Sequence, residues 1–80
     1  MIMFVLYSQD EDGNSAVHGV SAEVDPLEDW VAKYFEEYEL PEFQGFAIET
    51  KVMLEGEEYD VLYTDQADTD WWIEPTEVLG

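Results

Sequence analysis

Apolar and polar residues follow two different periods along this chain, and the two periods predict strands and a helix. Residues 2–8 form a continuous apolar run of β-prone side chains, which is typical of a strand near the centre of a sheet. Residues 16–24 then alternate, and their apolar face also carries His18. The polar segment 10–15 has the composition of a turn, so we expect the two strands to form a hairpin.

One amphipathic helix is predicted to run from Asp25 to Leu40. Asp25 suits the N-cap, Pro26 suits the first helical position, and Glu28 stands where a capping box has its acid. Pro41 then stops the helix. Six apolar side chains recur at helical spacing and form one stripe: Leu27, Trp30, Val31, Tyr34, Phe35 and Tyr38.

Strand-like alternation returns in the second half of the chain. Residues 43–64 predict a second hairpin with its turn at residues 55–56. Residues 65–70 are predicted as a loop, and residues 71–74 as a short last strand that Pro75 ends. The order β-β-α-β-β-β predicts one small α+β domain over residues 1–80. We expect a mostly antiparallel, twisted five-stranded sheet with one helix packed on it.

Charge changes this picture more than any other property of the chain. Twenty-one residues are Asp or Glu against two Lys and no Arg, so the net charge is -19. The chain is also 46% hydrophobic and 15% aromatic, which is unlike an acidic disordered tail. Such a charge repels nucleic acid and anionic membranes and attracts basic surfaces. We therefore expect a basic partner, with no direct nucleic-acid or membrane binding.

The density of the acids is within reach of the charge density of DNA. Surface scaling gives roughly 5,000 Å² for this mass, so about one acid per 240 Å². B-DNA, taken as a cylinder of roughly 10 Å radius, carries about one charge per 110 Å². Acids gathered onto one side of the protein would match that density.

Several acids stand where they do not favour stability. Acids at the C-terminal end of the predicted helix oppose the helix dipole, at about 0.3–1 kcal/mol each when exposed. Some pairs also fall near the distance between neighbouring phosphates on a DNA strand. Glu36 and Glu39 have helical spacing, with Cβ atoms ~5–6 Å apart. Glu58 and Asp60 stand ~6.6–6.8 Å apart on one face of a strand.

Three acidic sets are predicted to bind the partner. They are the helix face with the residue after Pro41, the second hairpin, and the loop and strand near the C-terminus. Their members are Asp29, Glu36, Glu37, Glu39 and Glu42; Glu55, Glu57, Glu58 and Asp60; and Asp65, Asp68, Asp70 and Glu74.

Trp71 and Trp72 are candidate anchors within the third set. Neighbouring strand residues point to opposite faces, so one helix cannot cover both side chains. We therefore expect one of the two at the surface, without deciding which. It would be either a rim residue or an interface anchor, since Trp and Tyr dominate hot spots.

Residue patterns for catalysis or metal binding are weak in this chain. The acidic turn of residues 10–14 has the spacing of a calcium loop, but Ser15 and Ser21 stand where an EF-hand needs Gly and Glu. His18 is the only histidine, and its place on an apolar face favours a partly buried structural role. We expect no enzyme activity, no cofactor and no metal.

In size, charge and α+β organisation, the whole chain resembles the small acidic inhibitor proteins of bacteriophages. These include anti-CRISPR and anti-restriction proteins and inhibitors of uracil-DNA glycosylase. The chain is also similar to acidic immunity proteins that block nuclease toxins. The resemblance implies a stoichiometric blocker of a basic nucleic-acid channel, and it assigns no role to a particular residue.

The leading hypothesis is therefore a DNA mimic that blocks the nucleic-acid groove of a CRISPR effector, a restriction enzyme or another DNA-processing enzyme. The alternatives are a halophile's acidic housekeeping domain and a small protein–protein adaptor or immunity protein. The chain has no Cys, and its first residues lack the basic start of a signal peptide. We expect a protein of the host cytoplasm, and its charge favours a monomer.

Overall fold

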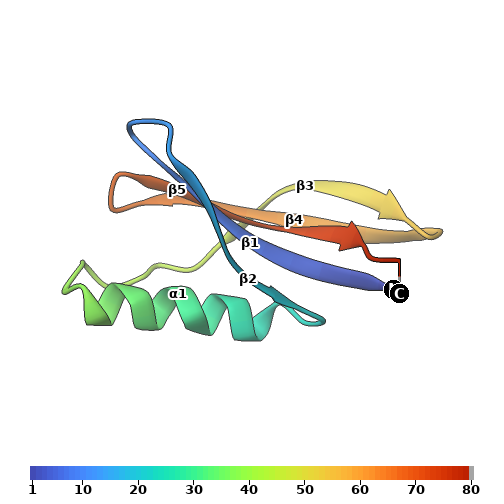
Figure 1. Ribbon diagram of the computed structural model, residues 1–80, viewed down its shortest axis with the longest axis horizontal. Helices are drawn as coiled ribbons and strands as arrows, with labels where there is room; N and C mark the ends of the chain where they lie inside the picture. The colour runs from blue at the N-terminus through green and yellow to red at the C-terminus, as the bar shows by residue number, and fades with distance from the viewer. Residues whose placement is uncertain (80) are drawn as a thin grey trace.

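The computed structural model describes residues 1–79. It consists of a five-stranded sheet with one helix on one of its faces (Figure 1). The element order confirms the predicted β-β-α-β-β-β arrangement. The elements are β1 (Ile2–Asp10), β2 (Ser15–Ser21), α1 (Asp25–Glu37), β3 (Ala47–Leu54), β4 (Glu57–Gln66) and β5 (Thr69–Glu77).

The last strand occupies the middle of the sheet. The strand order is β2-β1-β5-β4-β3, and all four neighbouring pairs are antiparallel. β1 therefore lies beside the central strand, as its apolar run indicates. β5 pairs with β1 over nine consecutive residues, which joins the two hairpins into one sheet.

The prediction of a short last strand is wrong. β5 runs through Pro75, whose Cα pairs with Phe4 and whose side chain is buried. The predicted loop 65–70 is a tight hairpin turn with Ala67 and Asp68 at φ of 56°. Both have left-handed backbone angles, as in a type I′ turn, but Ala67 is not one of the Gly, Asn or Asp residues that usually mark one. The turn chemistry was therefore not readable from residue type.

The helix is shorter than predicted, and its N-cap lies one residue earlier than the predicted Asp25. Its N-cap is Val24, with no side-chain capping hydrogen bond, so the predicted capping box does not form. After Glu37, the backbone turns left-handed at Glu39, at φ of 55°. The amide of Leu40 donates to the Phe35 carbonyl at 2.9 Å, which closes a Schellman motif. The helix thus ends before Pro41 is reached.

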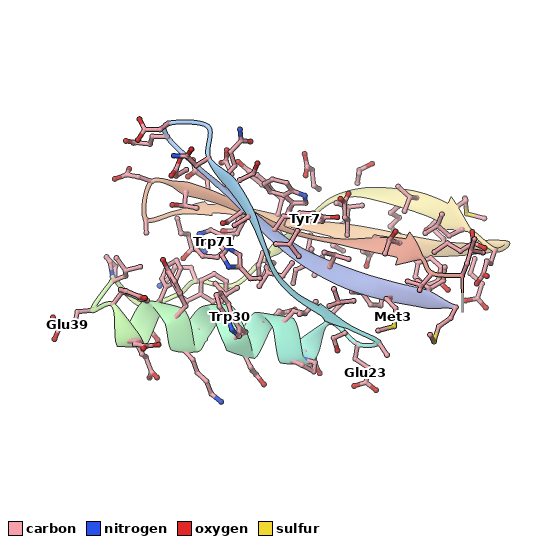
Figure 2. The ribbon with its side chains drawn as sticks, in the orientation of Figure 1. Met3, Tyr7, Glu23, Trp30, Glu39 and Trp71 are labelled. Carbon is pink, nitrogen blue, oxygen red and sulfur yellow. The ribbon has the colours of Figure 1, made fainter. Side chains whose placement is uncertain are left out.

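The helix buries Leu27, Val31 and Phe35 of its predicted stripe against one face of the sheet, whereas Trp30 is 38% exposed and Tyr38, at the C-cap, is 61% exposed. The buried core consists of Leu6, Leu27, Val31, Phe35, Trp71 and Ile73. Gly19 lets the helix approach β2, since a Cβ there would lie 3.2 Å from Leu27 Cδ2. Figure 2 shows Trp71 between helix and sheet. The opposite sheet face has no covering element among the described residues (Figure 1).

A bulge in β2 changes the faces predicted for that strand. Leu6 pairs with Gly19 but Tyr7 pairs with Val17, so His18 is an extra residue. His18 faces the helix, whereas Val20 pairs with Val5 and is 54% exposed. The prediction that His18 and Val20 share one face is therefore wrong, because alternation in sequence cannot reveal a bulge.

The molecule is elongated, with Cα extents of 40 × 21 × 20 Å. The β1–β2 turn, the β4–β5 turn and the C-terminal end of α1 lie towards one end of the long axis (Figure 1). The β3–β4 hairpin and both chain termini lie towards the other end (Figure 1). Among the described residues, no helix is long and apolar enough to cross a membrane.

Candidate acidic interaction surface

The acidic side chains remain in contact with solvent and have few partners. None of the 21 acids is buried, and only Glu28, Asp70 and Glu74 are partly covered. Within residues 1–79, the Lys51 ammonium lies 3.1 Å from Glu58 and 4.0 Å from Asp60. The accessible surface is 5,339 Å², close to the scaling value, so the acids are as dense as the sequence indicates. Nearly all of the negative charge is thus free to act on a partner.

Two turns far apart in sequence bring a larger acidic group together than predicted. Asp65 and Asp70 pair across β4 and β5, and Asp70 also pairs with Gln9 on β1. A shallow hollow of about 200 Å³ lies between the turns. It is lined by Gln9, Asp10, Glu11, Asp65, Asp68 and Asp70. Asp10 and Glu11 were not predicted as members of an acidic set, because only the strand order places β1 beside β5.

The Asp10 carboxylate is occupied by its own turn. It accepts hydrogen bonds from the Asp12 amide at 3.0 Å and the Asn14 amide at 2.9 Å. The Asn14 side-chain amide also donates to it, at 3.2 Å. Hydrogen bonds from Asn14 hold the pKa of Asp10 below its usual value. Among residues 1–79, no group of three or more acidic or histidine side chains is arranged to hold a metal ion.

The helix set lies at the same end of the molecule as these turns. Figure 2 shows Glu39 at the tip. The predicted helical position of Glu39 is wrong, because Glu39 lies outside the helix and its backbone is left-handed. A second hollow, of about 320 Å³, runs from the helix to the following segment. It is lined by Asp29, Ala32, Lys33, Phe35, Glu36, Leu40, Glu42 and Phe43.

The hairpin set lies towards the opposite end of the molecule (Figure 1). Its Glu58 and Asp60 face Lys51, so this predicted pair is partly neutralised by the chain itself. Hydrogen bonding and attraction from Glu58 raise the pKa of Lys51, which keeps this lysine charged. Glu55 lies 3.5 Å from the N-terminal ammonium. The hairpin is therefore the least purely anionic of the three sets.

Three acids occupy backbone positions where Gly is usually preferred. Glu39, Glu55 and Asp68 have φ of 55°, 51° and 56°. The first is the residue after a helix C-cap and the other two are in hairpin turns. A left-handed backbone costs a residue such as Glu39 or Glu55 roughly 1–2 kcal/mol, whereas aspartate tolerates it better. Charge is thus present at sites where stability alone favours glycine.

The two tryptophans differ in the way that strand geometry requires. Trp71 is 2% exposed, and its indole lies against Tyr34 and Phe35. Trp72 is partly exposed on the uncovered face and stacks on Tyr7, with centroids 5.4 Å apart and planes 15° apart. The prediction that one of the pair lies at the surface is confirmed in part, because Trp72 is partly exposed; Trp71 is buried, so its prediction as a partner-binding anchor is wrong.

His18 and Ser8 form a close pair that the sequence did not indicate. Ser8 Oγ and His18 Nε2 are 2.6 Å apart. The imidazole is stacked against Trp30 at 4.8 Å and lies 5.4 Å from Trp71. Burial lowers the pKa of His18. Ser8 is buried beneath these rings, so the pair satisfies two polar groups within an aromatic cluster rather than presenting a nucleophile.

Two tyrosines on the uncovered face are coupled to acids. The Tyr63 hydroxyl donates to Asp70 Oδ1 at 2.6 Å. This bond, with some burial and nearby negative charge, raises the pKa of Tyr63 to about 12. Burial, followed by the charge of Glu74, raises the pKa of Tyr7. Both hydroxyls therefore stay protonated at neutral pH.

No family model, curated protein or solved structure matches this chain.

Proposed function

We propose that the protein is a stoichiometric inhibitor that mimics the charge of nucleic acid and occupies the basic groove of a nucleic-acid-binding protein. The observation that carries this proposal is a net charge of -19 on an elongated domain whose Cα atoms extend over 40 × 21 × 20 Å. Targets of this chemistry include CRISPR effectors, restriction enzymes and other DNA-processing enzymes. The inhibitor acts in the host cytoplasm and catalyses nothing.

The linear charge density supports the mimicry. B-DNA carries one charge per ~1.7 Å of axis, so a 40 Å length carries roughly 24 charges. The protein carries roughly four fifths of that number over the same length. A groove lined with positive charge for duplex DNA therefore suits this elongated anionic domain by charge.

Acids at positions that lower the stability of the fold also support a functional role for the anionic surface. Glu39, Glu55 and Asp68 stand at left-handed positions, and no basic residue lies in the last turn of the helix. Residues held in unfavourable conformations commonly cluster at functional surfaces. Acids that served solubility alone could stand at unstrained positions instead.

Binding would follow from pairing of these carboxylates with lysine and arginine in the target. Long-range attraction accelerates encounter and is screened by salt, with a Debye length of ≈ 10 Å at 0.1 M. We expect affinities in the micromolar to nanomolar range at physiological salt, with association that slows as salt rises.

A displacement assay tests this function directly. A labelled DNA or guide-bound substrate is pre-bound to each of a panel of purified enzymes: a CRISPR effector, a restriction enzyme, a uracil-DNA glycosylase and a nuclease toxin. The protein is then titrated at about 50 mM and about 300 mM salt. Stoichiometric displacement at low salt that weakens at high salt is expected for a true target. Failure to displace the substrate from every enzyme at low salt would contradict the proposal.

Charge-reversed variants provide the matched control. The double variant Glu36→Lys/Glu39→Lys and the double variant Glu58→Lys/Asp60→Lys change the net charge equally but alter opposite ends of the molecule. A mimic whose helix end enters the groove loses displacement mainly with the first variant. Equal losses would indicate attraction by net charge without a defined contact surface.

Thermal melts separate the mimic from the halophilic alternative. A halophilic domain needs concentrated salt to fold, whereas a mimic must be folded at the low salt where it binds. We expect a cooperative melt at about 50 mM salt, with a midpoint that rises as screening improves. Loss of the fold below about 1 M salt would favour the halophilic housekeeping domain instead.

A further inference from the structure

The uncovered face of the sheet has an aromatic row at its centre. Trp72 on β5 pairs with Tyr7 on β1 and with Tyr63 on β4, so three aromatic side chains lie side by side across the strands. Tyr7 also pairs with Val17 on β2, which extends the row with a side chain that is 59% exposed. The row therefore spans four strands on the face that the helix leaves open.

Acids flank this row along the central strand. Asp70 and Glu74 stand two residues before and two residues after Trp72, hence on the same face. The Cα atom of each stands ~6.6–6.8 Å along the strand from that of Trp72, and each acid is coupled to one tyrosine of the row. Asp70 accepts from Tyr63 through Oδ1. Trp72 is thus surrounded by aromatic rings across the strands and by carboxylates along its own strand.

We propose that this face docks an arginine-bearing segment of a basic partner protein, with a guanidinium stacked on Trp72 and paired with Glu74 or Asp70. A guanidinium is planar and weakly hydrated, so it can lie on an aromatic face while its N–H groups bind a carboxylate. The stacked Tyr7 and Trp72 rings supply the apolar platform, and the partly covered acids supply charge at its rim.

Charge complementarity selects this occupant over others. The chain has a net charge of -19 and contains no arginine, so it has no guanidinium group of its own that could fill the site. Nucleic acid is repelled by Asp70 and Glu74. A second copy of this chain would bring the same acids face to face, which opposes a dimer through this surface. Lysine satisfies the charge but stacks less well, because its ammonium is compact and strongly hydrated.

This inference rests on the proposed function for the basic character of the partner, but it can be tested apart from it. The probes are an oligo-arginine peptide and an oligo-lysine peptide of equal length, titrated into the full chain by calorimetry at physiological salt. We expect about fivefold tighter binding of the arginine peptide. Chemical-shift changes should concentrate on the Trp72 indole N–H and the Tyr7 ring, rather than on Trp30.

Matched variants locate the contact. Trp72→Leu should weaken the arginine peptide about tenfold, while Trp30→Leu on the helix side should change it less than about twofold. Glu74→Gln should cost about fivefold, and Glu36→Gln, which removes the same charge from the helix, less than about twofold. Far-UV circular dichroism checks that each variant is folded. If Trp72→Leu does not fold, the chemical-shift changes of the wild-type protein with the arginine peptide show whether the peptide contacts Trp72.

Equal binding of the two peptides, or equal losses for Trp72→Leu and Trp30→Leu, would overturn the arginine site. So would a dimer in sedimentation that Trp72→Leu converts to monomer, since a second copy would then cover the face. If the protein displaces DNA from a target but the Trp72 and Glu74 variants match their controls, this inference fails and the proposed function stands. If the arginine preference depends on Trp72 but no enzyme is blocked, the proposed function fails and the docking face stands.

Discussion

Trp71 and Trp72 provide a sharp test of the fold, because adjacent and identical residues lie on opposite faces of the central strand. Each is replaced by leucine in a separate variant, so that composition and charge are the same in both. Trp71 is 2% exposed and Trp72 is partly exposed on the open face. The two variants should therefore differ widely in stability.

The magnitude for Trp71→Leu follows from burial and from the cavity left behind. Leucine buries roughly 70 Å² less apolar surface, which is worth about 2 kcal/mol at 25 cal/mol per Å². It also leaves roughly 60 Å³ unfilled, which costs about 1.4 kcal/mol at 24 cal/mol per Å³. The sum is about 3 kcal/mol. An 80-residue domain has only about 4–12 kcal/mol of total stability.

Trp72→Leu should cost about 1 kcal/mol. Its place opens to solvent, so no closed cavity forms, and the main loss is the stacking on Tyr7, which is worth about 0.5–1.5 kcal/mol. Leucine retains enough apolar surface to cover part of the central strand.

Urea unfolding followed by far-UV circular dichroism measures both values without depending on tryptophan fluorescence. With a slope of about 1 kcal/mol per M, the midpoint should fall by about 3 M for Trp71→Leu and about 1 M for Trp72→Leu. Equal shifts with unchanged slopes would refute the assignment of the two faces.

Three further predictions concern protonation and backbone conformation. Burial lowers the pKa of His18, so its stabilising contribution is complete above the unfolded value of about 6.5 and is lost as pH falls through the lower folded pKa. Between about pH 7.5 and 5.5, the melting temperature of His18→Gln should accordingly fall less than that of the wild type. An equal fall in the melting temperatures of the two proteins would contradict this. The pKa of Tyr63, raised to about 12, makes its stabilising contribution disappear as pH rises from about 10 to about 12. In an ultraviolet titration, Asp70→Asn should move the last-ionising tyrosine to lower pH, and no change on substitution would exclude the Asp70 hydrogen bond as the cause of the raised pKa. Glu39→Gly should raise the free energy of unfolding by about 1 kcal/mol, because glycine adopts a left-handed backbone without strain. Glu36→Gly makes the same charge change inside the helix and should lower the free energy of unfolding by about 1 kcal/mol. Calorimetric melts in which both variants change stability in the same direction would refute the backbone argument.

The periodic parts of the fold could be predicted from local sequence. The six-residue stripe from Leu27 to Tyr38 identified the helix, and alternation around residues 55–56 identified the second hairpin. The boundaries could not be obtained in this way. Pro75 lies inside β5, and Ala67 and Asp68 form a tight β4–β5 turn where a longer loop was predicted.

The candidate surface was predictable in composition but not in arrangement. Each of the three acidic sets is solvent-accessible as expected, because carboxylates without partners cannot be buried. Their grouping depends on strand order. β1 pairs with β5, which brings Asp10 and Glu11 beside Asp65 and Asp70, although the two turns are more than fifty residues apart.

By itself, the sequence determined the charge of the surface, the number and type of elements and the residues able to form a core. These depend on side-chain chemistry and on periods of two or 3.6 residues, which are local properties. Only the tertiary structure decided that Trp71 is buried while Trp72 forms an aromatic row with Tyr7 and Tyr63 on the open face. Strand pairing and the side chosen by the helix are non-local, because they depend on which of several possible contacts bury the most apolar surface together. The same non-local choice placed the acids along an elongated molecule.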